Sequence, residues 1–348
     1  MHNLTRIKES RAPSQMRLAA SAVLVAAAIA TGIVAGQASA NPTGFAASKL
    51  RHGGLKVTGT NAGERIALRL QAGEPGVLQV DVNDDGSADF SFERTDIRRI
   101  TVDGRAGDDV VRIDESNGVF TDTIPTTILG ARGNDNLAGG SGAETLRGGP
   151  GTDRIDGNRG NDVAFMGSGD DTFVWDPGDG SDVVEGRSGA DTMLFNGAAV
   201  AEQVDVSANG NRLTFFRNPG NITMDTAGVE RVDFNALAGT DVVTVNDLTG
   251  TDVRTLNVDL AGTLGGASGD GEADRVVVNG TDRDDTITVN GDAGGVKVSG
   301  LAATVAVLHS EAANDRLEIN TLDGRDRVDS GELAAGAIQL FVDGVLVP

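Results

Sequence analysis

Acidic side chains recur at a fixed spacing through the middle of the chain. Seven nine-residue units, which begin at Gly130, Gly139, Gly148, Gly157, Met166, Pro177 and Gly186, each place a glycine at the fourth position and a carboxylate at the sixth. The carboxylates are Asp135, Glu144, Asp153, Asp162, Asp171, Asp182 and Asp191. Calcium takes six to eight oxygen ligands from carboxylates and backbone carbonyls, and glycine lets a backbone fold closely around an ion. The spacing therefore predicts cation sites built into turns.

The units also predict the elements that position these turns. The eighth positions are all apolar, so each unit is a turn followed by a short strand with one inward side chain. Two units form a coil of eighteen residues, and turns eighteen residues apart stack on the same edge of a solenoid. Asp, Asn and Gly are also good turn formers without any ion. That alternative does not explain a carboxylate at the sixth position of every unit.

The units resemble the RTX calcium-binding repeat GGxGxDxUx. The resemblance covers about residues 130–194, and a weaker copy, Gly104 to Arg112, carries Gly107, Asp109 and Val111 at the matching positions. It implies an all-β protein with a parallel β-roll, or β-solenoid, at its centre. It also implies that one turn supplies the carbonyls of its second and fourth positions with its Asp, and the next turn those of its first and third positions with its Asp.

Carried over to this chain, the resemblance implies sites on both edges of the roll. One edge would hold three: Ala131, Gly133 and Asp135 with Gly148, Pro150 and Asp153; Gly149, Gly151 and Asp153 with Met166, Ser168 and Asp171; and Gly167, Gly169 and Asp171 with Gly186, Ser188 and Asp191. The opposite edge would hold two: Gly140, Gly142 and Glu144 with Gly157, Arg159 and Asp162; and Asn158, Gly160 and Asp162 with Pro177, Asp179 and Asp182.

Departures from the pattern weaken particular sites. Glu144 is one methylene longer than the expected Asp, so we expect its site to be the weakest or empty. Asn158 and Arg159 interrupt the glycines of the fourth unit. Two extra residues, Trp175 and Asp176, must bulge out of the coil if Asp171 and Asp191 are to meet.

The first forty residues predict export. Basic residues precede an apolar run from Leu18 to Gly36, and Ala38-Ser39-Ala40 follows. This order is typical of a secretory signal peptide cleaved after Ala40. A membrane anchor, which needs about 20 apolar residues, is the alternative. We expect a protein that is extracellular, free or attached to the cell wall, with no membrane span after cleavage.

The composition supports a cation-dependent extracellular fold. The whole chain has a formal charge of −22, and removal of residues 1–40 leaves 25 basic and 50 acidic side chains, a charge of −25. Such a charge argues against nucleic acid as a partner and predicts self-repulsion until cations neutralise the turns. Calcium would then act as a folding ligand. The chain has no cysteine, so disulfides cannot stabilise it.

Four regions are predicted: the signal peptide 1–40, a β-rich region 41–129, the roll 130–195 and a region 196–348 that forms an irregular β-solenoid or a β-sandwich. Residues 41–60 lack periodicity and predict a loose entry segment. Asp81 to Asp89 is interpreted as a β-hairpin turn, with an extra calcium loop as the alternative. In 196–348, Asp turns enter Val-rich strands, but too few glycines remain for us to expect calcium sites there.

Calcium binding is the function that the sequence favours most. An extracellular adhesin, whose C-terminal β region binds a cell-surface glycan or a protein, is the alternative. A β-helix polysaccharide lyase or epimerase is a third reading. For it, Arg212, Arg217, Asp225, Arg231 and Asp233 would line a groove. No hydrolase, zinc-protease or phosphate-loop motif is present, so we expect no catalytic residues and do not expect an enzyme.

Overall fold

The computed structural model describes residues 39–40 and 44–348, and their regular structure is almost entirely β-strand. The remainder of the predicted signal peptide lies outside the described residues. Three short 3-10 helices interrupt the strands: η1 (Arg51–Gly53), η2 (Arg94–Asp96) and η3 (Pro219–Asn221). In the part of the chain that is described, no helix is long and apolar enough to cross a bilayer.

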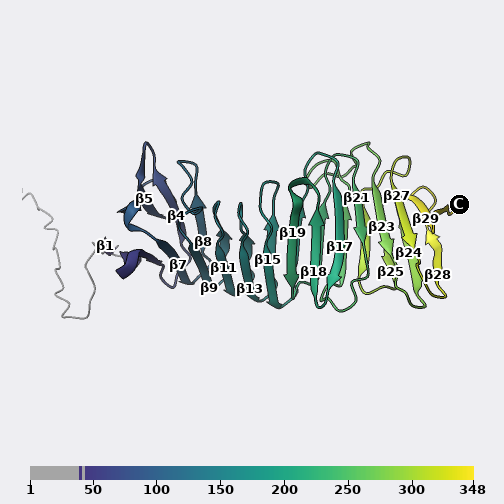
Figure 1. The fold of residues 1–348 in the computed structure, drawn as a ribbon, viewed down its shortest axis with the longest axis horizontal. Coiled ribbons are helices and arrows are strands. Elements are labelled where there is room, and N and C mark those ends of the chain that lie inside the picture. The colour runs from purple at the N-terminus through teal and green to yellow at the C-terminus, as the bar shows by residue number, and fades with distance from the viewer. Residues whose placement is uncertain (1–38, 41–43) are drawn as a thin grey trace, which may run out of the picture. The chain divides into compact units, whose positions relative to one another are not determined.

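The described strands form two sheets, and Figure 1 shows the chain running from one end of the sheets to the other. Sheet A contains, in spatial order, β1 (Ser39–Ala40), β2 (Ala46–Lys49), β3 (Gly54–Thr58), β7 (Arg99–Ala106), β9 (Thr126–Arg132), β11 (Thr145–Pro150), β13 (Val163–Ser168), β15 (Val183–Ser188), β19 (Ile222–Ala227), β18 (Arg212–Arg217), β17 (Gln203–Asn209), β21 (Val242–Val245), β23 (Arg275–Asn279), β27 (Arg316–Asn320), β29 (Gln339–Val342) and β30 (Val345–Leu346).

Sheet B faces sheet A across the core. In spatial order it contains β28 (Arg327–Leu333), β24 (Thr286–Asp292), β25 (Gly295–Ser299), β26 (Thr304–Leu308), β22 (Thr255–Asp259), β20 (Arg231–Asn235), β16 (Thr192–Asn196), β14 (Thr172–Trp175), β12 (Arg154–Asp156), β10 (Asn136–Ala138), β8 (Val110–Asp114), β4 (Arg65–Gln71), β5 (Glu74–Val82) and β6 (Phe90–Glu93).

The nonapeptide units form the predicted parallel β-roll. From β9 to β16, successive strands alternate between the two sheets, and each pairs in parallel with the strand one coil later. Leu137 lies opposite Ile155, eighteen residues later, and Leu146 lies opposite Ala164. All seven eighth-position side chains are fully buried between the sheets. The all-β solenoid expected from the sequence is therefore confirmed.

The two extra residues are accommodated differently from our expectation. Trp175 does not bulge out of the coil: it is the last residue of β14, fully buried, and its ring stacks on Phe195 at 4.0 Å. The additional length lies in the following turn, where the Trp175 Nε1–H donates to the Gly180 carbonyl. The pairing shifts from eighteen to twenty residues, so that Thr172 lies opposite Thr192. A large apolar side chain is more stable in the core than in a solvent-exposed bulge.

The region before the repeats belongs to the same coil. Our expectation of a loose segment at 41–60 is wrong, because β2 and β3 pair within sheet A and Phe45, Leu55 and Val57 are buried in the core. The strand β7 then pairs in parallel with β9. The roll therefore extends upstream of Gly130.

The segment Asp81 to Asp89 forms the predicted hairpin turn between the antiparallel strands β5 and β6. Its carboxylates are already satisfied by protein donors. Asp81 accepts from the Arg69 guanidinium at 2.6 Å and from the Gly86 N–H at 2.9 Å, and Arg112 binds both oxygens of Asp84 at 2.7 Å. These contacts favour a structural turn over a calcium loop.

The C-terminal region continues the solenoid with two three-stranded meanders. One, β17 to β19, adds to sheet A, and the other, β24 to β26, adds later to sheet B. Five strands separate β15 from β27 in sheet A, and five separate β16 from β28 in sheet B. The second meander thus restores the register between the sheets that the first one shifted.

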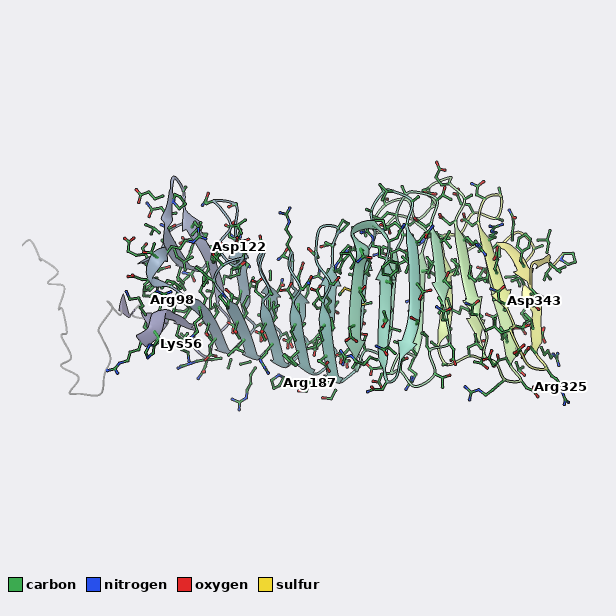
Figure 2. All side chains as sticks on the ribbon, in the orientation of Figure 1. Lys56, Arg98, Asp122, Arg187, Arg325 and Asp343 are labelled. Atoms are coloured by element: carbon green, nitrogen blue, oxygen red, sulfur yellow. The ribbon has the colours of Figure 1, made fainter. Side chains whose placement is uncertain are left out.

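The core is a continuous row of apolar side chains between the sheets. Where the repeats meet the first meander, Trp175, Phe195, Phe215 and Phe234 pack with ring centroids between 4.0 and 6.0 Å apart. Charged side chains such as Arg187 and Arg325 lie on the outside of the coil (Figure 2). Among the described residues, rows of buried carboxylates lie in the turns.

Candidate metal centre

The turns that lead from sheet A to sheet B, here called the first edge, carry a ladder of carboxylates. The backbone N–H of each carboxylate residue donates to one carboxylate oxygen of the next turn. The N–H of Asp135 reaches Asp153 at 2.8 Å, that of Asp153 reaches Asp171 at 2.7 Å, and that of Asp171 reaches Asp191 at 2.9 Å. The three predicted carboxylate pairs of this edge are thus adjacent.

The turns that lead from sheet B to sheet A, the second edge, carry the same ladder. Glu144 donates to Asp162 at 2.6 Å, and Asp162 donates to Asp182 at 2.8 Å. The ladder recurs on this edge in the C-terminal region, where Glu202, Asp241, Asp274 and Asp315 are linked in turn. The sequence analysis missed this extension. The recurring Asp before a Val-rich strand was the available signal.

One oxygen of these carboxylates lacks a donor in most turns. The ladder satisfies Oδ1, whereas Oδ2 is buried without a hydrogen-bond partner in eight aspartates: Asp109, Asp135, Asp153, Asp162, Asp171, Asp182, Asp191 and Asp241. Each of these side chains is at most 2% exposed. A buried acceptor without a partner loses its hydration without compensation, which is destabilising.

The backbone four residues before the carboxylate distinguishes these eight turns. It is left-handed, with positive φ, at Arg105, Ala131, Gly149, Asn158, Gly167, Gly178, Arg187 and Leu237. We call these turns open. A positive φ is costly for any residue other than glycine or asparagine, so four of the eight turns maintain a strained conformation at this position.

Five other turns are self-capped. In them the residue four before the carboxylate has no positive φ, and its N–H donates to the carboxylate of its own turn. The carboxylates are Glu64, Glu144, Glu202, Asp285 and Asp315. In the open turns, the left-handed backbone at this position turns its N–H away from the carboxylate. The open turns therefore lack the hydrogen bond that caps the carboxylate. Asp274 belongs to neither class, and Asp326 follows left-handed Leu322 but is partly exposed.

Stacked open turns approach each other so closely that the fourth position is glycine in all eight and the second position is glycine in three. A Cβ on Gly149 would lie 1.9 Å from the Ala131 carbonyl oxygen, and one on Gly151 would lie 1.8 Å from that of Gly133. The same contacts recur one coil later at Gly167 and Gly169. The second- and fourth-position carbonyls of one turn therefore point at the next turn, on the side where the resemblance places an ion.

Burial raises the pKa of the open-turn carboxyls. It raises the pKa of Asp153 to about 7, of Asp182 to about 8 and of Asp162 to about 9. Asp191 is raised to about 6, and Asp135 and Asp171 are raised in the same direction. The ladder N–H opposes each shift but does not cancel it. Without a cation, Asp162 and Asp182 therefore hold protons at neutral pH.

The donors present fit calcium. Among the residues that the structure describes, no three or more His, Cys, Asp or Glu side chains converge on one point, so side chains alone form no metal cage. Each turn instead offers one carboxylate oxygen without a donor, and carbonyl oxygens directed at the neighbouring turn. All are the hard oxygen ligands that calcium prefers.

The two positions where we expected the pattern to be weakened, Glu144 and Asn158, have different turn conformations. Glu144 is self-capped by the Gly140 N–H at 2.7 Å, although its Oε1 still lacks a donor. This cap supports the expectation that its site is the weakest. Asn158 instead adopts φ 58°, and its side chain donates to the Gly139 carbonyl. Asn tolerates this conformation, so the interrupted glycines leave the Asp162 turn open.

The residues suggested for a catalytic groove do not lie together. Arg212 pairs with Asp225 in sheet A, whereas Arg231 pairs with Asp233 in sheet B. Arg217 is buried and binds Glu202. These five residues therefore do not line one groove.

Comparison with known proteins adds an independent finding. No curated protein matches the chain. The family model of the RTX calcium-binding nonapeptide repeat matches residues 127–153, 138–173 and 178–197 with four copies. These residues contain six of the eight open turns described above. Over residues 127–197 the chain therefore carries RTX calcium-binding nonapeptide repeats of the hemolysin type.

Proposed function

We propose that this protein is a secreted calcium-binding protein in which calcium binds between stacked open turns and thereby stabilises the roll. One observation carries the proposal: each open turn buries a carboxylate oxygen that no protein group satisfies. A bound cation would provide the missing partner for that oxygen and compensate its negative charge. The strongly acidic composition supports the same conclusion, because bound cations reduce the repulsion between neighbouring turns.

The chain's own residues would perform three tasks. The ladder N–H groups hold Oδ1 of aspartates such as Asp153 and Asp162 and leave Oδ2 available to a cation. The left-handed second positions prevent self-capping. The glycines at the second and fourth positions allow the carbonyls to approach the next turn. Bound calcium would supply charge neutralisation and cross-links between coils.

Circular dichroism of the full chain during a calcium titration tests this proposal. We expect a calcium-dependent gain of β signal and a rise in melting temperature. Typical extracellular calcium modules bind on the order of 10⁻⁴ to 10⁻³ M, so the transition is expected in that range. The double variant Asp153→Ala with Asp162→Ala should weaken both effects.

The control is Asp285→Ala, which removes a carboxylate from a self-capped turn. It should leave the calcium dependence unchanged. An identical spectrum and melting temperature without calcium and at calcium concentrations well above that range would mean that the open turns are ordinary turns.

Secretion is a part of the proposal that the N-terminal sequence supports. Protein recovered from the medium of the producing cells should begin at Asn41, as N-terminal sequencing would show. Recovery only from the membrane fraction, with residues 1–40 retained, would favour an anchor instead.

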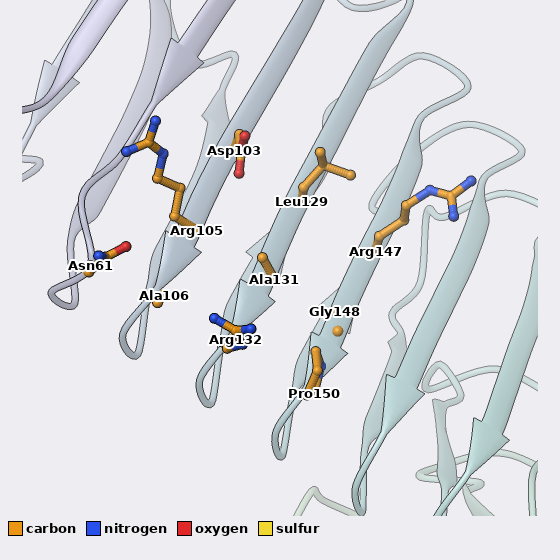
Figure 3. A pocket seen from close by; sticks show the side chains of 11 residues that line it. Asn61, Asp103, Arg105, Ala106, Leu129, Ala131, Arg132, Arg147, Gly148 and Pro150 are labelled. Atoms are coloured by element: carbon orange, nitrogen blue, oxygen red, sulfur yellow. The ribbon is translucent and has the colours of Figure 1, made fainter.

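A second candidate function, binding of an anionic cell-surface glycan, is favoured by a groove of about 640 Å³ on the outer face of sheet A. Figure 3 shows Arg105, Arg132 and Arg147 around it, with Leu129 between them. The Arg147 guanidinium lies over the Phe165 ring at 4.3 Å, which restricts its position. Arginine recognises carboxylates through paired hydrogen bonds. This adhesin would bind through the roll and not through the C-terminal region.

Calorimetry with a polyuronate tests this candidate in the presence of calcium. The triple variant Arg105→Gln, Arg132→Gln, Arg147→Gln should lose binding while its calcium-dependent folding is retained. Equal affinity of the wild type and the variant would reject the groove as a glycan site.

A further inference from the structure

The turn Gly104 to Asp109 lies upstream of the residues that the repeat model matches, yet it stacks as the matched turns do. The Gly107 N–H donates to the Arg132 carbonyl at 2.9 Å. One coil later, the Gly133 N–H donates to Pro150 at 3.1 Å. The Gly151 and Gly169 N–H groups donate in the same way to the third-position carbonyls of their neighbours, Ser168 and Ser188, at 2.9 Å. The turn is therefore the first in a row of identical contacts.

Asp109 has the same unsatisfied oxygen as the aspartates of the matched repeats. It is fully buried, its Oδ1 accepts from the Glu64 N–H at 2.7 Å, and its own N–H donates to Asp135 at 2.8 Å. Its Oδ2 has no donor. Burial raises the pKa of Asp109 to about 7. The environment thus disfavours a carboxylate that lacks a cation beside it.

The backbone of this turn is also that of an open turn. Arg105 adopts φ 80°, the same value as Ala131 at the equivalent position of the next turn. A Cβ on Gly133 would lie 1.9 Å from the Gly107 carbonyl oxygen, so this carbonyl points at the next turn as that of Gly133 does. Figure 3 shows the turns that follow Ala106, Arg132 and Pro150 side by side.

We propose that calcium binds between the turn Gly104 to Asp109 and the turn Gly130 to Asp135. The Arg105 and Gly107 carbonyls and the Asp109 carboxylate would face it from one side. The Gly130 and Arg132 carbonyls and the Asp135 carboxylate would face it from the other. The proposal rests on the proposed function, because it assigns calcium to open turns, and it adds a fourth site to the three expected on the first edge.

The row of sites begins at this turn and not before it. The preceding turn ends in Glu64, whose carboxylate accepts from the Thr60 N–H of its own turn at 3.1 Å. Glu64 is therefore self-capped and closes the ladder. The sequence marks this turn only as a weaker copy of the unit, because Arg105 replaces the usual glycine at the second position. Strand pairing, with Arg105 opposite Ala131, places this arginine in register with the left-handed residue of the next turn.

Counting bound calcium tests the proposal directly. Native mass spectrometry of the full chain at saturating calcium should show one ion fewer for Asp109→Asn than for the wild type. The amide can still accept the Glu64 N–H, but its NH₂ group replaces the oxygen that would bind the cation. The matched control Asp285→Asn, in a self-capped turn of the same edge, should bind as many ions as the wild type.

A mutation-free measurement covers the case in which Asp109→Asn fails to fold. Crystals of the wild-type chain grown with calcium should show an anomalous peak between Asp109 and Asp135. Peaks between Asp135, Asp153 and Asp171 without one at Asp109 would overturn this inference and leave the proposed function intact. Absence of bound calcium from the whole wild-type chain would reject the proposed function as well.

Discussion

The repeat roll, residues 130–195, and the C-terminal region, residues 196–348, share one coil but satisfy their turn carboxylates differently. In the roll, six aspartates leave an oxygen without a donor. In the C-terminal region, Asp285 and Asp315 accept N–H groups of their own turns. Glu202 also binds the buried Arg217 through Oε1, although its Oε2 lacks a donor. Among the described C-terminal residues, only Asp241 lies in an open turn.

This difference shows that forming the solenoid and binding a cation are separate requirements, although the repeat sequence meets both at once. The solenoid needs an inward apolar side chain and a turn in each half coil, and both regions provide them. Dependence on a cation arises from one backbone conformation in each turn, which decides whether an N–H of the chain or an external charge satisfies the carboxylate. The same fold can therefore be cation-dependent in one region and self-sufficient in the next.

Removal of calcium should produce the largest difference in stability between the two regions. At neutral pH with a chelator, peptides from 130–195 should lose protection from hydrogen exchange. Strands β23 to β29 should retain more, because their turns are mostly self-capped. Hydrogen-exchange mass spectrometry measures both regions in one sample. Equal loss in the two regions would remove the distinction between the turn classes.

Acidification should partly replace calcium in the roll. Burial raises the pKa of the open-turn carboxyls above the unfolded value of about 3.9, to about 6 at Asp191 and to about 9 at Asp162. The folded state thus binds more protons, and the stability contributed by protonation is complete below about pH 4 and is lost as the pH rises through those values. The melting temperature of the chelated protein should fall from about pH 5 to about pH 8.

The same measurement with saturating calcium provides the control. Calcium competes with protons for the carboxylates, so its stabilisation should grow as the pH rises. A chelated protein that becomes more stable between about pH 5 and about pH 8 would contradict the assignment of the raised pKa values.

The buried pair Arg217 and Glu202 should stabilise the C-terminal region without calcium. Arg217→Met leaves a buried carboxylate without its partner, which typically costs about 3–5 kcal/mol. Chemical denaturation at saturating calcium measures the loss, and added calcium should not restore it. The control is Arg231→Met, which breaks an exposed pair with Asp233 and should cost at most about 1 kcal/mol. Similar losses for both variants would argue against a buried charge at Glu202.

Glycine substitutions should show a smaller contrast. Gly149→Ala adds a Cβ 1.9 Å from the Ala131 carbonyl at φ 126°, so we expect a cost of about 2–3 kcal/mol. Gly210→Ala also has a positive φ, 68°, but no atom lies within 4 Å of the added Cβ. This variant should lose only about 1–2 kcal/mol of unfolding free energy, which is the cost of left-handed backbone for a residue with a Cβ. Equal unfolding free energies for the two variants would show that turn contacts matter less than backbone strain.

Much of the roll could be predicted from the sequence, because the residues of each unit determine its local structure. The apolar eighth positions, such as Leu137 and Ile155, determine which side chain points inward. The eighteen-residue period brings Asp135 beside Asp153. The order of strands in 196–348 could not be predicted, because long connections leave several pairings compatible with the same alternation. The pairing of β2 and β3 with the coil was missed because residues 41–60 show no periodicity.

The sequence by itself determined the positions of the carboxylates and glycines and the period at which they repeat. The tertiary structure alone decided which carboxylates are capped by an N–H of their own turn. That outcome depends on backbone conformation four residues earlier and on the turn stacked beside it. Arg105 and Gly140 show the physical reason: the arginine adopts the left-handed form within a stacked row, whereas the glycine does not and caps Glu144.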